Sequence, residues 1–137
     1  NSQRAVKSIL FGIGLLLSCC HLAIMLYDPT TSLHIQIVSM GIALLLVVIG
    51  NVSGKTERNF FVGLRLPWTI ASDANWKATH RFAGKLMVVA GLALIPASFL
   101  TSSFLPAIFL IVSSAVIPAF YSYWYFRSIE SNIPNSR

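Results

Sequence analysis

The uncharged stretch from Leu86 to Phe126 constrains the fold more than any other feature of this sequence. It contains 41 residues without a single Asp, Glu, Lys or Arg. As one helix it would be about 60 Å long, roughly twice the thickness of the hydrocarbon core of a bilayer. We therefore expect two membrane-spanning helices here. The hydroxyl side chains of Thr101, Ser102 and Ser103 favour a turn between them, because they compete for backbone hydrogen bonds.

Two further apolar stretches, Ser8 to Tyr27 and Leu33 to Val52, each reach the roughly 20 residues that a spanning helix needs. Over the whole chain 55% of the residues are hydrophobic and only 10% are charged, which excludes a soluble globular domain and a disordered chain. The sequence thus predicts an all-α integral membrane protein with one domain of four transmembrane helices. The predicted spans are 5–27, 33–52, 83–101 and 105–126, with an ordered loop at 53–82 and a tail at 127–137.

The positive charges all fall on one side of these four spans. They precede the first span, lie between the second and third, or follow the fourth, at Arg4, Lys7, Lys55, Arg58, Arg65, Lys77, Arg81, Lys85, Arg127 and Arg137. The turns on the other side contain no Lys or Arg. Cytoplasmic loops of membrane proteins carry an excess of these residues, so we expect both termini and the loop 53–82 in the cytoplasm. The net charge of +6 fits an anionic membrane surface, and direct binding of nucleic acid is not predicted.

The loop between the second and third spans differs in composition from the rest of the chain. Pro67 disfavours a helical conformation at Leu66 and interrupts any helix there. Ser72 followed by Asp73 has the pattern of a helix N-cap with an acid in the first turn, so a helix is expected to run from Asp73 into the third span. An interfacial belt is one interpretation of this loop, with its tryptophans at headgroup depth and its cations on lipid phosphates.

The order of residues in the loop resembles the signature of the SdpI-type immunity-protein family. The matching residues are Gly50, Asn51, Asn59, Gly63, Leu64, Arg65, Pro67, Trp68, Thr69, Trp76, His80 and Arg81, with an acid at Asp73. Leu66 stands where the family usually has Thr, and Asp73 where Glu is common. The resemblance covers roughly residues 35–127. Longer relatives carry further N-terminal spans with a Pro- and His-containing motif that this sequence lacks.

This resemblance implies a multi-pass protein of the bacterial cytoplasmic membrane that gives resistance to a secreted, membrane-active peptide toxin. It also implies a signal-transducing receptor that holds a transcriptional repressor at the membrane. The implied partners are the peptide toxin, a cytoplasmic repressor protein and lipid headgroups, and a homo-oligomer is compatible with the sequence. The implied binding and signalling residues are Asn51, Asn59, Gly63, Arg65, Pro67, Trp68, Thr69, Asp73, Trp76, His80 and Arg81.

Catalytic chemistry is not predicted from the sequence, and neither is a cofactor or a metal site. The three histidines fall on different segments, and the adjacent Cys19 and Cys20 lack the spacing of metal ligands. A small-solute or ion transporter is one alternative, since such proteins place an ionisable group inside the bilayer. His21 is the candidate intramembrane polar site for that function. An accessory structural subunit of a larger membrane complex is the other alternative.

Pairs of small residues at i and i+4 predict where the helices approach one another, because small side chains let two backbones come close. The sequence offers three such pairs: Gly14 with Ser18, Ala93 with Ala97, and Ala115 with Ala119.

Overall fold

The computed structural model describes residues 2–55 and 63–131. This part of the chain forms helices α1 (Ser2–Met25), α2 (Leu33–Ser53), α3 (Pro67–Ala71), α4 (Asp73–Leu100) and α5 (Leu105–Ser131). The four long helices are each long and apolar enough to cross a membrane, whereas α3 is a single short turn of helix. The predicted all-α architecture with four spans is confirmed.

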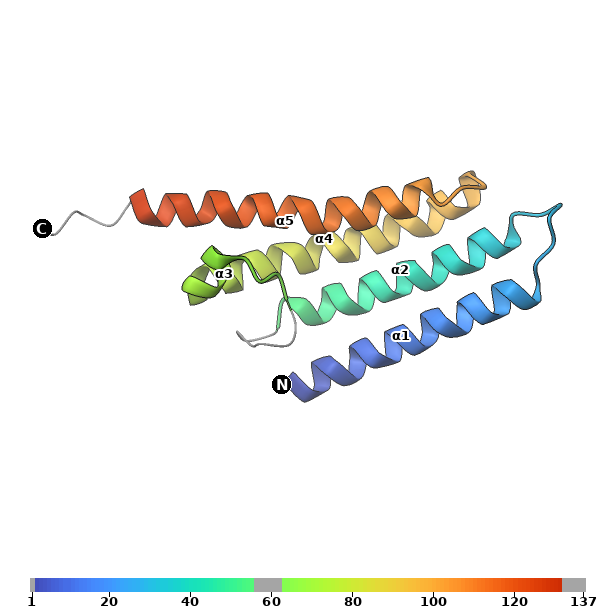
Figure 1. The fold of residues 1–137 in the computed structure, drawn as a ribbon, viewed down its shortest axis with the longest axis horizontal. Coiled ribbons are helices and arrows are strands. Elements are labelled where there is room, and N and C mark those ends of the chain that lie inside the picture. The colour runs from blue at the N-terminus through green and yellow to red at the C-terminus, as the bar shows by residue number, and fades with distance from the viewer. Residues whose placement is uncertain (1, 56–62, 132–137) are drawn as a thin grey trace, which may run out of the picture.

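The long helices lie side by side in one row, in the order α1, α2, α4, α5 (Figure 1). Within the described residues, α1 packs against α2 alone, while α2 also packs closely against α4 and touches α5. The α1–α2 and α4–α5 turns lie at one end of the row. At the opposite end lie the start of α1, the end of α5 and the short helix α3, which rests beside the beginning of α4 (Figure 1).

Local sequence signals account for where these helices begin. The side-chain oxygen of Ser72 accepts a hydrogen bond from the backbone N–H of Asn75 at 3.3 Å, so Ser72 is the N-cap of α4. Pro67 opens α3 directly after an extended Leu66, as expected for a proline at the first helical position. In the turn before α2, the backbone N–H and the hydroxyl of Thr30 both donate to Asp28 Oδ1. These bonds lower the pKa of Asp28.

Helix α4 begins at Asp73, as the Ser72–Asp73 pattern predicted, so residues 73–82 of the predicted loop are helical turns that lead into the third span. The end of the fourth span differs from the expected one. Helix α5 continues to Ser131, past the predicted end of the fourth span at residue 126. The first part of the predicted tail is therefore helical, because α5 extends beyond its apolar section, and residues 132–137 lie outside the described part of the chain.

The closest approach between helices is made by glycines of α2 and α4. A Cβ atom added to Gly84 would lie 2.5 Å from the carbonyl oxygen of Gly50, and one added to Gly91 would lie 2.6 Å from that of Ala43. Both pairs of small residues, 43 with 50 and 84 with 91, are seven positions apart on their helices. Seven residues correspond to two turns, which returns each pair to one face.

The pair Gly14 and Ser18 does not form the predicted contact, and each of the two alanine pairs has one exposed and one half-buried member. Gly14 is exposed and has no neighbour within 4 Å of an added Cβ atom. Ala93 and Ala115 are exposed too. Spacings of four residues between small side chains are common in any apolar helix, so they carry little information about which face meets a partner. The spacing of seven across two facing helices is the feature that identifies the contact.

Candidate functional site

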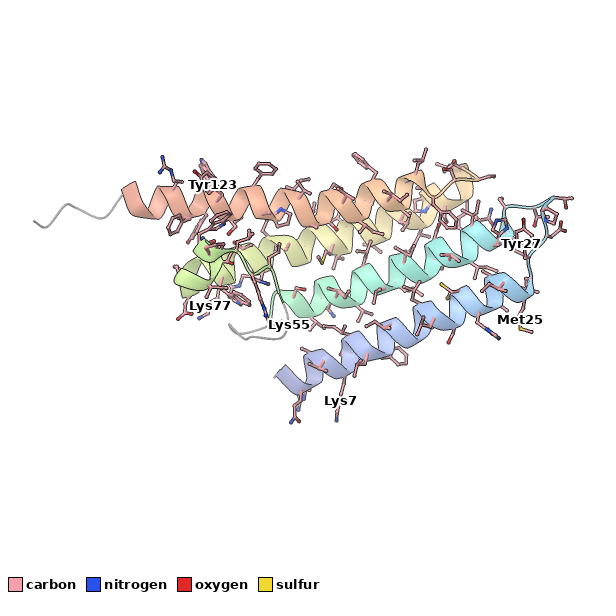
Figure 2. The ribbon with its side chains drawn as sticks, viewed as in Figure 1. Lys7, Met25, Tyr27, Lys55, Lys77 and Tyr123 are labelled. Atoms are coloured by element: carbon pink, nitrogen blue, oxygen red, sulfur yellow. The ribbon has the colours of Figure 1, made fainter. Side chains whose placement is uncertain are left out.

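The residues of the family-like motif gather at the end of the molecule that carries α3 and the N-terminal turns of α4. Figure 2 shows Lys7, Lys55, Lys77 and Tyr123 toward this end, and Met25 with Tyr27 at the other. The motif segment from Gly63 to Thr69 lies against α4. Five residues make the contacts between them, and we call these residues the motif framework: Gly63, Thr69, Asn75, Trp76 and His80.

His80 fastens the segment that precedes α3. Its Nε2 accepts a hydrogen bond from the backbone N–H of Leu64 at 3.0 Å, and its Nδ1 lies 2.9 Å from the carbonyl oxygen of Trp76. Because Nε2 is the acceptor, these contacts assign the proton to Nδ1, which donates to that carbonyl. The ring stacks on Trp76 with centroids 4.0 Å apart, and both side chains are buried. This arrangement uses the neutral form of the imidazole.

Gly63 is required by the same contact. Its φ angle of +132° lies in a region that residues with side chains rarely adopt. An added Cβ atom would also overlap Nε2 of His80 and would lie 2.9 Å from the Trp76 ring. The glycine therefore serves both the turn and the close approach of the backbone to the two rings.

Thr69 closes the turn that leads into α3. Its buried hydroxyl oxygen accepts the backbone N–H of Leu66 at 2.9 Å, and it lies 2.8 Å from the carbonyl oxygens of Leu64 and Leu66, to either of which it donates. The side chain of Leu66 makes no capping hydrogen bond. The unusual residue at position 66 therefore leaves this turn intact, because Thr69 supplies the polar contact.

Asn75 joins three helices through one buried side chain. Its Nδ2 donates to the carbonyl oxygens of Trp68 in α3 and Ser122 in α5, at 3.2 and 3.1 Å. Its Oδ1 accepts from the hydroxyls of Thr79 and Ser122, at 2.9 and 3.1 Å. An amide has two donor hydrogens and two acceptor lone pairs, so all four are satisfied although the residue is 0% exposed.

The remaining motif residues lie on the surface of this framework. Arg65, Pro67, Asp73 and Arg81 are exposed. Trp68 is half-buried, with its ring edge against Tyr123 of α5 at a centroid distance of 5.3 Å. The indole Nε1 of Trp68 is buried and has no hydrogen-bond partner within residues 2–55 and 63–131. The site thus presents the cations Arg65 and Arg81 and the ring of Trp68 on the hydrogen-bonded motif framework.

Three predicted site residues lie apart from the motif framework or outside the described residues. Asn51 is exposed near the end of α2, where its Oδ1 accepts from Lys55 Nζ at 3.3 Å. Asn59 lies outside the described residues. His21 is exposed on α1, the helix that packs only on α2, and is not brought near the motif.

Neither Asn75 nor Ser122 was predicted from the sequence to be a functional residue. A weak signal for Asn75 exists, because Asn75 and Thr79 repeat at the same spacing of four as Trp76 and His80. Ser122 offers no signal of this kind, since it is 47 residues from Asn75. Among the described residues, no group of three or more His, Cys, Asp or Glu side chains is placed to hold a metal ion.

A four-span membrane protein with a short motif segment bound to the third span is the class that this fold and site define. Residues 55–122 match the model of the SdpI/YfhL protein family, and the chain belongs to this family, as its motif indicated. It is 34% identical over 98 residues to Immunity protein SdpI of Bacillus subtilis (strain 168). That match covers 70% of this chain and 47% of the relative, so the chain spans about half the length of the curated relative it matches. No solved structure matches the chain.

Proposed function

We propose that this protein gives a bacterium immunity to a secreted, membrane-active peptide toxin from within the cytoplasmic membrane. Membership of the SdpI/YfhL family and the name of the B. subtilis relative support this function. The observation that carries the proposal is the construction of the motif. Thr69, Asn75, Trp76 and His80 are buried, and together with Gly63 they hold the exposed Arg65 and the half-buried Trp68 at the surface.

The proposed orientation places the motif end in the cytoplasm. The lysines and arginines of the described residues lie in the first turns of α1, between α2 and the apolar part of α4, or near the end of α5, all toward this end. Such an excess is typical of the cytoplasmic side. The toxin then meets the helices from the lipid or from the outer side, and the motif end responds on the inside.

The surface of the motif suits a protein partner in the cytoplasm. Tryptophan and arginine are the residues most enriched at the energetic centres of protein interfaces. Trp68 is half-buried, and its edge-on contact with Tyr123 holds the ring at a fixed angle. We propose that this surface captures a repressor protein when toxin is bound, which would add signalling to immunity.

Survival of a toxin-sensitive bacterium tests the proposal. The host should lack an immunity protein of its own and should be challenged with a panel of membrane-active bacterial peptide toxins. Loss of a central tryptophan contact costs about 2 kcal/mol, which corresponds to a roughly 30-fold loss of affinity. We expect the natural chain to raise survival against at least one toxin. We expect Trp68→Ala or Arg65→Ala to reduce survival toward that of cells with an empty vector.

The control is Lys77→Ala. It removes an exposed cation of α4 that does not belong to the motif framework. All variants must reach the membrane in equal amounts, measured by immunoblotting of membrane fractions. Equal survival of Trp68→Ala, Arg65→Ala and the natural chain at equal abundance would overturn the role assigned to this surface. No protection against any toxin of the panel would overturn immunity itself.

A further inference from the structure

The groove between α2 and α4 at the motif end is separate from the contacts of the motif framework. It is open, has a volume of about 530 Å³, and is lined by Gly50, Asn51, Gly54, Lys55, Arg81, Gly84, Lys85, Val88 and Val89. Gly50, Gly54 and Gly84 line the groove without side chains, where α2 and α4 are in backbone contact.

The chemistry of the groove changes along its length. Three cations, Lys55, Arg81 and Lys85, lie toward the end of the bundle, and all three are exposed. The half-buried Val88 and the exposed Val89 follow further along α4 and form the apolar part of the groove, which we call its floor. From Arg81 to Val89 the helix rises about 12 Å, so the groove leads from a cationic mouth to an apolar floor.

The charges at the mouth are not neutralised by acids in the part of the chain that the structure describes, because none of the lining residues is Asp or Glu. Lys55 donates one hydrogen bond, to Asn51 Oδ1 at 3.3 Å. Arg81 and Lys85 are four residues apart and thus project from the same side of α4. A phosphodiester suits such a mouth, since a guanidinium can bind two phosphate oxygens at once while an ammonium adds a point charge.

We propose that this groove is a binding site for one anionic phospholipid, of the phosphatidylglycerol or cardiolipin class. The phosphate lies between Lys55, Arg81 and Lys85, and an acyl chain runs along Val88 and Val89 into the bilayer. Basic pockets between transmembrane helices are known to hold headgroups of this kind. A free phosphate would use the cations and leave the apolar floor empty, whereas a phospholipid uses both. The site does not depend on the proposed immunity function.

Binding to the purified full chain in an uncharged detergent tests the site. Native mass spectrometry can compare retention of phosphatidylglycerol with that of phosphatidylcholine carrying the same acyl chains. We expect selective retention of phosphatidylglycerol by the natural chain. The double variant Arg81→Gln/Lys85→Gln should lower its affinity about 30-fold, from the loss of two cations near the lipid phosphate. Val89→Gln should lower it as well, because that change makes the floor polar.

The matched control is Arg4→Gln/Arg127→Gln, which removes the same charge from exposed positions on α1 and α5 that do not line the groove. This variant should bind phosphatidylglycerol like the natural chain. Glycerophosphoglycerol, the headgroup without acyl chains, should compete poorly. Equal retention of the two lipids overturns the proposal, as does an equal loss of affinity in the two double variants. Full competition by the headgroup alone would show a phosphate site and overturn the lipid site.

Discussion

Helix α2 packs extensively against both α4 and α1, and the two contacts differ in the kind of atom that lies next to the glycines. Against α4, added Cβ atoms at Gly84 and Gly91 would strike backbone carbonyl oxygens. Against α1, the glycines meet side chains instead: Gly12 would face Leu45 Cδ1 at 3.0 Å, and Gly41 would face Cys19 Cβ at 2.9 Å. The α2–α4 contact is one of backbone against backbone. In the α1–α2 contact the glycines meet side-chain atoms: the flexible end of Leu45 at Gly12, and at Gly41 the Cβ atom of Cys19, which is fixed to the backbone of α1.

This difference indicates which contacts determine the arrangement of the helices. In a bilayer, burying apolar side chains between helices gains little, because lipid tails are as apolar as the side chains. Close backbone packing and polar contacts distinguish one arrangement of helices from another. Both are concentrated on α4, which touches α2 through glycines and α5 through Asn75. Helix α1 is equally apolar but contributes fewer buried residues.

The largest effect is expected from Gly84→Ala, which breaks the tighter of the two contacts. The new methyl group would lie 2.5 Å from a carbonyl oxygen that belongs to the backbone of α2 and cannot turn aside. Overpacking of this kind costs about 3 kcal/mol when the backbone must shift. Reversible unfolding in mixed micelles with increasing dodecyl sulfate measures the loss. Gly91→Ala faces the carbonyl of Ala43 in the same way and should also be destabilised. Natural stability in both variants would show that the helices separate at no cost.

The second largest effect is expected from the loss of the buried hydrogen bonds of Asn75. Asn75→Asp keeps the shape of the side chain but replaces the Nδ2 donor by an oxygen, which would face the carbonyls of Trp68 and Ser122. Leaving buried polar groups unpaired costs about 2 kcal/mol. We expect a loss of stability of this size, together with faster proteolysis near α3, because that helix loses its tie to α4.

Asn51→Asp is the control for this change, since Asn51 is exposed and the same substitution there meets water. Its unfolding curve should overlay that of the natural chain. If Asn75→Asp unfolded at the natural dodecyl sulfate concentration, the four hydrogen bonds of Asn75 would not be what joins the three helices.

The sequence predicts those parts of the fold that depend on composition. The length of Leu86 to Phe126 requires two spans, and the turn at residues 101–104 is where the hydroxyl side chains suggested it. The start of α4 follows from Ser72 and Asp73, since an N-cap is a local feature. The order of the helices in the row does not follow, because all four spans are apolar enough to cross a membrane and their composition does not show which of them pair.

The contacts among the predicted site residues could not be derived from the sequence. The resemblance singled out Gly63, Thr69, Trp76 and His80, all of which the structure brings together. Nothing local indicates that Nε2 of His80 accepts from a backbone N–H 16 residues earlier. Ser122 was out of reach for the same reason, since it meets Asn75 only when α5 folds back against α4.

The smallest effect on stability is expected on α1, where Gly12→Ala and Gly14→Ala test the contact between α1 and α2. Alanine is favoured over glycine in a helix by about 0.5 to 1 kcal/mol. At Gly12 the new methyl group meets the movable end of Leu45, so this gain and a small steric cost nearly cancel. At Gly14 nothing lies within 4 Å, so the variant should be as stable as the natural chain or slightly more stable. The same unfolding assay separates two causes: a penalty at Gly14 equal to that at Gly84 would mean that loss of glycine itself, and not contact with the backbone of α2, is what destabilises the protein.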